Sequence, residues 1–125
     1  MPRADDEGFR AESAVLLRRR REALLAELGT TEAQLVEIRT AKGDTSTDDE
    51  HDPEGPTLAV EWSRAEGLRA ASERELAELQ DAAARVAAGT YGVCVDCGLE
   101  IPIERLRVRP SAARCVPCAE AAAAR

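Results

Sequence analysis

Four cysteines near the C-terminal end constrain the fold of this chain more than any other feature. They form two Cys-x-x-Cys pairs that flank 17 residues. Each pair can place two sulfur atoms on one ion, and two pairs complete a tetrahedral shell. The spacing therefore predicts one structural Zn²⁺ bound by Cys94, Cys97, Cys115 and Cys118. A shell of four protein ligands leaves no open position for a catalytic water.

The cysteine pattern has alternatives: two disulfides, a redox dithiol, free core cysteines or an iron–sulfur cluster. The N-terminus lacks the basic-then-apolar order of a signal peptide, so we expect a cytoplasmic chain. Paired cysteines in a reducing compartment are more often metal ligands than disulfides. Gly98 follows the first pair, where a tight turn lets backbone N–H groups approach the thiolates. The residues after the second pair can start a short C-terminal helix.

The composition leaves little material for a broad core. Leu, Ile, Val and Phe together number 24 of 125 residues, and the net charge is -7. Only three residues are aromatic: Phe9, Trp62 and Tyr91. A chain of this kind folds on long helices joined along a narrow seam, or on a metal, rather than on a globular core. No run of 18 apolar residues is present, so we expect no membrane span.

Residues 9–42 carry a heptad pattern in a background of strong helix formers. Gly43 is placed to end this helix as its C′ residue. The seam positions are Leu17, Leu24, Leu28, Thr31, Leu35 and Ile38.

A second heptad pattern predicts a helix from about Leu58 to Ala88, roughly 46 Å long. Thr57 can cap its start and Gly89 closes it. The seam positions alternate at four and three residues and are Leu58, Trp62, Ala65, Arg69, Ser72, Leu76, Leu79, Ala83 and Val86.

Residues 43–57 form an acidic loop between the two helices, because Gly, Pro, Asp, Ser and Thr dominate them. A connection this short favours an antiparallel hairpin over helices that pack separately with other subunits. We therefore expect an all-α chain: a coiled-coil hairpin at 1–88 with an acidic tip at 43–57, then a four-cysteine zinc-finger module at 89–125. The candidate partner-binding acids, called the tip acids below, are Asp48, Asp49, Glu50, Asp52 and Glu54.

No arrangement of residues in the sequence indicates catalysis. His51 is the single histidine, and no serine or cysteine nucleophile pairs with it in a recognisable pattern. Its place in the acidic loop indicates a solvated side chain. The loop lacks the order of oxygen ligands found in a calcium-binding loop. We expect a binding protein and not an enzyme.

Residues 89–118, which include YGVCVDCGLEIPIERLRVRPSAARCVPC, resemble the TraR/DksA family of zinc-finger transcription regulators. The shared features are the G-x-C-x-x-C-G opening, the I-x-x-x-R-L stretch, the R-P pair and the closing C-x-x-C. The preceding helix, acidic loop and helix agree in order and length. The resemblance implies one structural zinc, a hairpin that enters the secondary channel of bacterial RNA polymerase, and an acidic tip that alters open promoter complexes.

The sequence also departs from the family. The D-x-x-D-x-A motif of the family's tip is not reproduced, although Asp52 and Glu54 can stand in for its acids. Basic residues that serve the family's response to ppGpp are replaced by Ala71 and Glu78, while Arg109 is present near the zinc site. We therefore do not expect strong dependence on ppGpp.

Two other functions remain open on the sequence. A coiled-coil adaptor could use the zinc knuckle to bind some other protein. Direct binding of nucleic acid by the zinc module is disfavoured, because four arginines at 91–118 face three acids and four thiolates.

Overall fold

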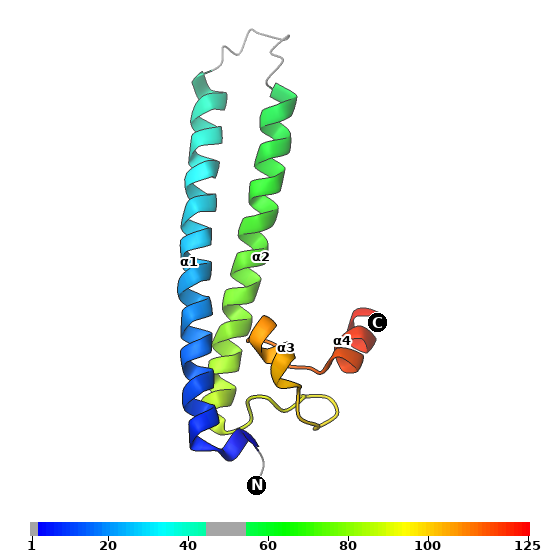
Figure 1. Cartoon of the computed structure of the whole chain (residues 1–125). Coiled ribbons are helices and arrows are strands. Elements are labelled where there is room, and N and C mark those ends of the chain that lie inside the picture. The colour runs from blue at the N-terminus through cyan, green and yellow to red at the C-terminus, as the bar shows by residue number, and fades with distance from the viewer. Residues whose placement is uncertain (1–2, 45–54) are drawn as a thin grey trace. The chain divides into compact units, whose positions relative to one another are not determined.

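The computed structural model describes the backbone of residues 3–44 and 55–125, and the side chains of 3–43 and 57–125. A short 3-10 helix, η1, is followed by two long and two short α-helices (Figure 1). Their bounds are η1 Arg3–Asp5, α1 Glu7–Asp44, α2 Gly55–Ala88, α3 Ile103–Val108 and α4 Val116–Ala123. In these ranges there is no strand, and one isolated bridge pairs Val93 with Glu100. The all-α prediction is confirmed.

The chain divides into two compact units. Unit 1 contains Met1–Glu22 and Glu75–Arg125, and unit 2 contains Ala23–Arg74. Each long helix contributes residues to both units. The predicted division into a hairpin at 1–88 and a zinc-finger module at 89–125 stays a prediction. No helix in the described part of the chain is long and apolar enough to cross a membrane.

The two long helices pair in opposite directions within each unit. In unit 1, Arg10 Nε donates to the carbonyl of Val86 at 3.1 Å. Ten residues later in α1, Arg20 forms two hydrogen bonds to Glu75, at 2.5 and 2.9 Å. In unit 2, the guanidinium of Arg39 lies 5.7 Å from the centre of the Trp62 ring. As α1 advances, its partners in α2 move back along the chain, so the expected hairpin pairing is confirmed.

The seam of α1 follows the predicted heptads closely. Leu17 and Leu24 are buried in unit 1 and unit 2 respectively, and Thr31, Leu35 and Ile38 are buried further along unit 2. Successive positions in this set are three, four or seven residues apart, so they share one face of the helix. The hydroxyl of Thr31 donates to the carbonyl of Glu27 at 3.0 Å, which satisfies a polar group in the seam.

The seam of α2 departs from the prediction near its C-terminal end. Ala65 and Leu79 are buried as expected, but Ala83 is exposed and Ala82 is fully buried. In the same stretch, Arg85 donates to the carbonyl of Ser111 at 3.5 Å. The last turns of α2 therefore contact residues after the helix as well as α1.

Both helix ends beside the loop differ from the sequence prediction. Gly43 lies inside α1, which continues to Asp44, so Gly43 is not the C′ residue. α2 begins at Gly55 rather than Leu58, and Thr57 is therefore inside the helix instead of capping it. Pro56 is the second residue of α2. Proline lacks a backbone N–H, and at this position that N–H would have no acceptor within the helix.

Gly89 ends α2, as predicted, through a left-handed turn. Its φ is +76°, a region that L side chains rarely adopt. The N–H of Gly89 donates to Val86, and the N–H of Thr90 donates to Arg85, which together form a Schellman motif. Arg10 also donates to the carbonyls of Val86 and Ala87. The last carbonyls of α2 are thus satisfied by a glycine turn and by a cation that complements the helix dipole.

Candidate metal centre

The N-terminal residues of unit 1 support the segment that leads into the first cysteine pair. Arg3 donates to the carbonyl of Gly92 at 3.0 Å and to that of Ile101 at 2.6 Å. Its guanidinium also lies 4.9 Å from the centre of the Phe9 ring. Gly92 has a φ of +85°, and an added Cβ would lie 3.1 Å from Phe9, so only glycine suits this position. The sequence analysis missed this support, because a single arginine before the first helix has no periodic signal.

The first cysteine pair sits in a tight knuckle. Gly98 has a φ of +76°, and its N–H donates to the carbonyl of Cys94 at 3.0 Å. The N–H of Cys94 donates in turn to the carbonyl of Leu99 at 2.8 Å. The predicted turn at Gly98 is therefore present. It brings backbone N–H groups of the 94–99 loop toward the cysteine sulfurs.

The second cysteine pair is positioned by α4. Cys115 directly precedes the helix and Cys118 lies in its first turn. Pro117 occupies one of the first two helical positions, where proline is favoured. The expected C-terminal helix is present, but it starts at Val116 and contains a cysteine. α3, between the two pairs, was not predicted from the sequence.

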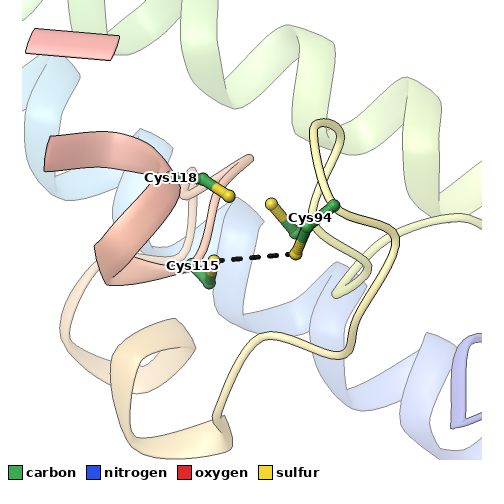
Figure 2. A group of neighbouring side chains, drawn as sticks. Cys94, Cys115 and Cys118 are labelled. Carbon is green, nitrogen blue, oxygen red and sulfur yellow. Dashed lines mark hydrogen bonds between the residues drawn. The ribbon is translucent and has the colours of Figure 1, made fainter. Parts of the chain in front are cut away.

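The four cysteine sulfurs converge on one point. All four Sγ atoms lie within 4.8 Å of one another, and Figure 2 shows the sulfurs of Cys94, Cys115 and Cys118 directed toward a common centre. The Sγ atoms of Cys97 and Cys115 are 3.8 Å apart. Zn–S bonds of about 2.3 Å in a tetrahedron place neighbouring sulfurs about 3.8 Å apart. All four cysteines are free thiols, and their separation and chemistry fit one zinc ion.

The protonation of the thiols also favours a cation at the centre. Backbone N–H groups, that of Cys97 first and those of Cys115 and Asp96 next, lower the pKa of Cys94 to about 6. Hydrogen bonds with the sulfurs of Cys115 and Cys94, together with desolvation, raise the pKa of Cys118 to about 12. Without a metal, the cluster therefore retains protons, because adjacent thiolates repel. Zinc binding removes these protons, so the affinity for zinc falls as the pH is lowered.

Two contacts tie the cysteine pairs together independently of any metal. The N–H of Val95 donates to the carbonyl of Ala113 at 2.9 Å. The side chain of Arg114 donates to the carboxylate of Asp96 at 2.6 Å. Asp96 stands inside the first pair and Arg114 stands directly before the second, so opposite charges beside the ligands were a usable sequence signal. These contacts hold the two pairs near the geometry that the metal requires.

The module between the cysteine pairs is fixed to the end of α2 by polar contacts. The buried hydroxyl of Tyr91 donates to the carbonyl of Pro110 at 2.7 Å. Burial raises the pKa of Tyr91 to about 12. Glu78 accepts from Arg109 at 3.1 Å and from the hydroxyl of Ser111 at 3.4 Å. Glu78 therefore joins α2 to the segment after α3.

The predicted tip residues are not part of this centre. Asp48, Asp49, Glu50, Asp52 and Glu54 lie outside the described residues, as does His51. The structure therefore brings together all four predicted metal ligands and leaves the tip acids as a prediction.

The zinc finger of this chain and its fold are each similar to those of known proteins. Residues 89–122 match the family model described as the prokaryotic dksA/traR C4-type zinc finger. A solved structure, that of transcription factor DksA2 from Pseudomonas aeruginosa, is similar to this chain with a TM-score of 0.75 and 24% identity. The similarity covers 92% of this chain and 83% of that chain. Among curated proteins, no sequence matches. The chain is DksA/TraR-like: it has that zinc finger and shares the fold of DksA2.

Proposed function

We propose that this protein is a transcription regulator that binds bacterial RNA polymerase through its secondary channel and modulates initiation. In this proposal Cys94, Cys97, Cys115 and Cys118 bind one structural zinc ion. The observation that carries the proposal is the fold shared with DksA2 over 92% of the chain, together with the matching zinc finger. A metal shell completed by four cysteines favours a regulator over an enzyme, because it offers no position for substrate or water.

The charge of the chain supports a role for the tip. The net charge is -7, and residues 44–54 contain acids but no lysine or arginine. A negative apex complements a channel with basic walls, and such complementarity speeds association and selects the partner. The tip acids then act on the polymerase, while the zinc module and the base of the hairpin provide most of the binding surface.

A pull-down with core RNA polymerase tests the binding part of this proposal. The zinc-loaded chain is expected to bind the core enzyme and to be displaced by another factor that occupies the secondary channel. Recovery of no polymerase subunit would overturn the proposal and favour an adaptor for some other protein.

Neutralising three of the five tip acids tests the regulatory part. Asp49→Asn, Asp52→Asn and Glu54→Gln together are expected to abolish the effect on transcription and to change polymerase affinity less than about threefold, since the tip is a small share of the interface. The matched control neutralises three exposed acids of α1, at Glu12, Glu22 and Glu32, and should retain activity. Equal activity of the tip variant would eliminate this mechanism.

A further inference from the structure

The first cysteine pair lies in a short hairpin formed by residues 92–101, which we call the knuckle hairpin. Its two arms are joined by backbone hydrogen bonds: the N–H of Ile101 donates to the carbonyl of Gly92, and the N–H of Cys94 donates to that of Leu99, each at 2.8 Å. An isolated two-stranded hairpin is marginally stable at best in water. An arm pairing as short as this one therefore needs support from elsewhere in the chain.

The side chain of Arg3 joins the two arms at the base of the knuckle hairpin. A single atom, Arg3 Nη2, donates to the carbonyl of Gly92 at 3.0 Å and to that of Ile101 at 2.6 Å. Arg3 also forms an ion pair with Glu100 at 3.7 Å, and its side chain is only 18% exposed. Hydrogen bonds from a charged donor are roughly twice as strong as neutral ones. Separating the arms would leave a largely buried cation without its acceptors, so Arg3 opposes that separation.

An aromatic contact adds to the support from Arg3. The Phe9 ring lies beneath the Arg3 guanidinium, and its centre is 5.9 Å from the centre of the Tyr91 ring. A Cβ at Gly92 would lie 3.1 Å from the Phe9 ring and 3.2 Å from Arg3 Nη2. The N-terminal segment, defined here as residues 3–10, therefore packs tightly against the base of the knuckle hairpin.

We propose that Arg3 is a positioning residue of the zinc site, and that docking of the N-terminal segment and binding of zinc strengthen each other. Arg3 holds the base of the knuckle hairpin, and the metal holds Cys94 and Cys97 at the other end. Such coupling is reciprocal, so zinc strengthens docking by the same factor as docking strengthens zinc binding. Loss of zinc then releases the N-terminal segment. This goes beyond the proposed function, because it concerns the metal site and holds whatever the partner is.

The affinity of the full-length chain for zinc provides the first test, measured by competition with a chelator of known affinity. Arg3→Gln is expected to weaken zinc binding about tenfold, which is the lower end of the effect of removing residues that orient metal ligands. Arg18→Gln removes the same charge from an exposed position of α1 in the same unit and should change the affinity less than about twofold. Arg3→Lys retains a cation with three N–H donors on one nitrogen, so it should recover part of the loss.

Cobalt distinguishes positioning from a general loss of stability. Co²⁺ held by four thiolates in a tetrahedron has characteristic visible absorption, which reports the geometry of the site directly. Arg3→Gln should reach the wild-type spectrum at saturation, because the ligands are unchanged, but only at about tenfold higher free Co²⁺. If Arg3 merely stabilised the fold equally with and without metal, the midpoint of this titration would not move.

Hydrogen exchange at the start of α1 tests the reverse direction and requires no substitution. The N–H groups of Phe9 and Arg10 donate to Asp6, at 3.1 and 2.9 Å, so their exchange reports the order of the N-terminal segment. Removing zinc from the wild-type chain should speed their exchange about tenfold, the factor by which Arg3 strengthens zinc binding. In Arg3→Gln the same removal should change their exchange less than about threefold.

Three results would overturn the proposal. One is equal zinc affinity of Arg3→Gln and Arg18→Gln, and another is an Arg3→Lys variant that binds zinc no better than Arg3→Gln. The third is unchanged exchange at Phe9 and Arg10 after zinc is removed. Circular dichroism at saturating zinc checks that each variant remains helical, and if Arg3→Gln unfolds, the exchange of the wild-type chain decides. None of these measurements involves polymerase, so the two proposals fail separately.

Discussion

At the scale of single residues, Tyr91 provides a clear pH signature. Its pKa is raised to about 12 because the hydroxyl is buried, whereas an exposed tyrosine ionises near 10.0. A raised pKa means that the stabilisation is complete below pH 10 and is lost as the pH rises toward 12. The chain has one tyrosine, so absorbance at 295 nm reports this group alone. We expect a midpoint well above 10, together with alkaline unfolding.

The hydrogen bond from Tyr91 to Pro110 should also be visible in stability. Tyr91→Phe leaves the carbonyl of Pro110 without this donor and is expected to cost about 1–2 kcal/mol of unfolding free energy. Urea unfolding at fixed free zinc measures the difference. A tyrosine midpoint near 10, with no loss in the phenylalanine variant, would mean that the hydroxyl faces solvent.

The ion pair between Asp96 and Arg114 should tune the affinity for zinc. Both side chains are partly exposed, at 36% and 41%, so the pair is worth at most about 1 kcal/mol. Asp96→Asn is therefore expected to weaken zinc binding about two- to fivefold, measured by competition with a chelating dye. Glu104→Gln, an exposed carboxylate on α3, is the matched control. The interpretation fails if Asp96→Asn, Arg114→Gln and the control have the same affinity.

A site residue could be predicted from the sequence only where its function imposes a fixed spacing on neighbouring residues. The four cysteines were predictable because metal geometry imposes a fixed pattern on neighbouring residues. Arg3 could not be found in that way, since its hydrogen bonds to the carbonyls of Gly92 and Ile101, and its ion pair with Glu100, join it to residues about ninety or more positions later. A carbonyl acceptor exists at every residue, so no residue type in the sequence indicates which one will be used.

At the scale of helices, replacing glycine by alanine should have opposite effects on stability at Gly67 and Gly89, because their backbone conformations differ. Gly67 lies inside α2 with nothing within 4 Å of an added Cβ, so Gly67→Ala should stabilise by about 1 kcal/mol. Gly89 has a φ of +76°, so Gly89→Ala should destabilise by about 1–2 kcal/mol. Thermal unfolding at fixed zinc gives both values. Changes of the same sign would contradict the assigned end of α2.

The buried residues of a helix seam could be predicted where α1 and α2 pack only against each other. The buried residues Leu24, Thr31 and Leu35 all fall on the predicted heptad face. The prediction failed at Ala83, which is exposed, while Ala82 is buried. The end of α2 also contacts Ser111, and a heptad pattern describes one partner only. The six residues of α3 are too few for a periodic signal.

At the scale of the whole molecule, zinc should hold the C-terminal module together. Zinc-binding free energies of order 10 kcal/mol are linked to folding in modules of this size. A chelator is therefore expected to increase hydrogen exchange across residues 90–118 by several orders of magnitude. Unchanged exchange after complete removal of the metal, confirmed by elemental analysis, would show that the module folds without it.

The division of the chain into two units has a consequence for the order of events during synthesis. Unit 2 is one continuous stretch, Ala23–Arg74, so all its contacts are available while the ribosome is still translating the cysteines. Unit 1 consists of Met1–Glu22 and Glu75–Arg125, so the contacts between these two stretches can form only after the second stretch has been made. Residues 1–22 therefore lack these contacts until the second stretch of unit 1 has been made, when Arg3 and Arg10 acquire their carbonyl partners. A nascent chain stalled before Glu75 should be cut by proteases within residues 1–22, whereas residues 23–74 should already resist them.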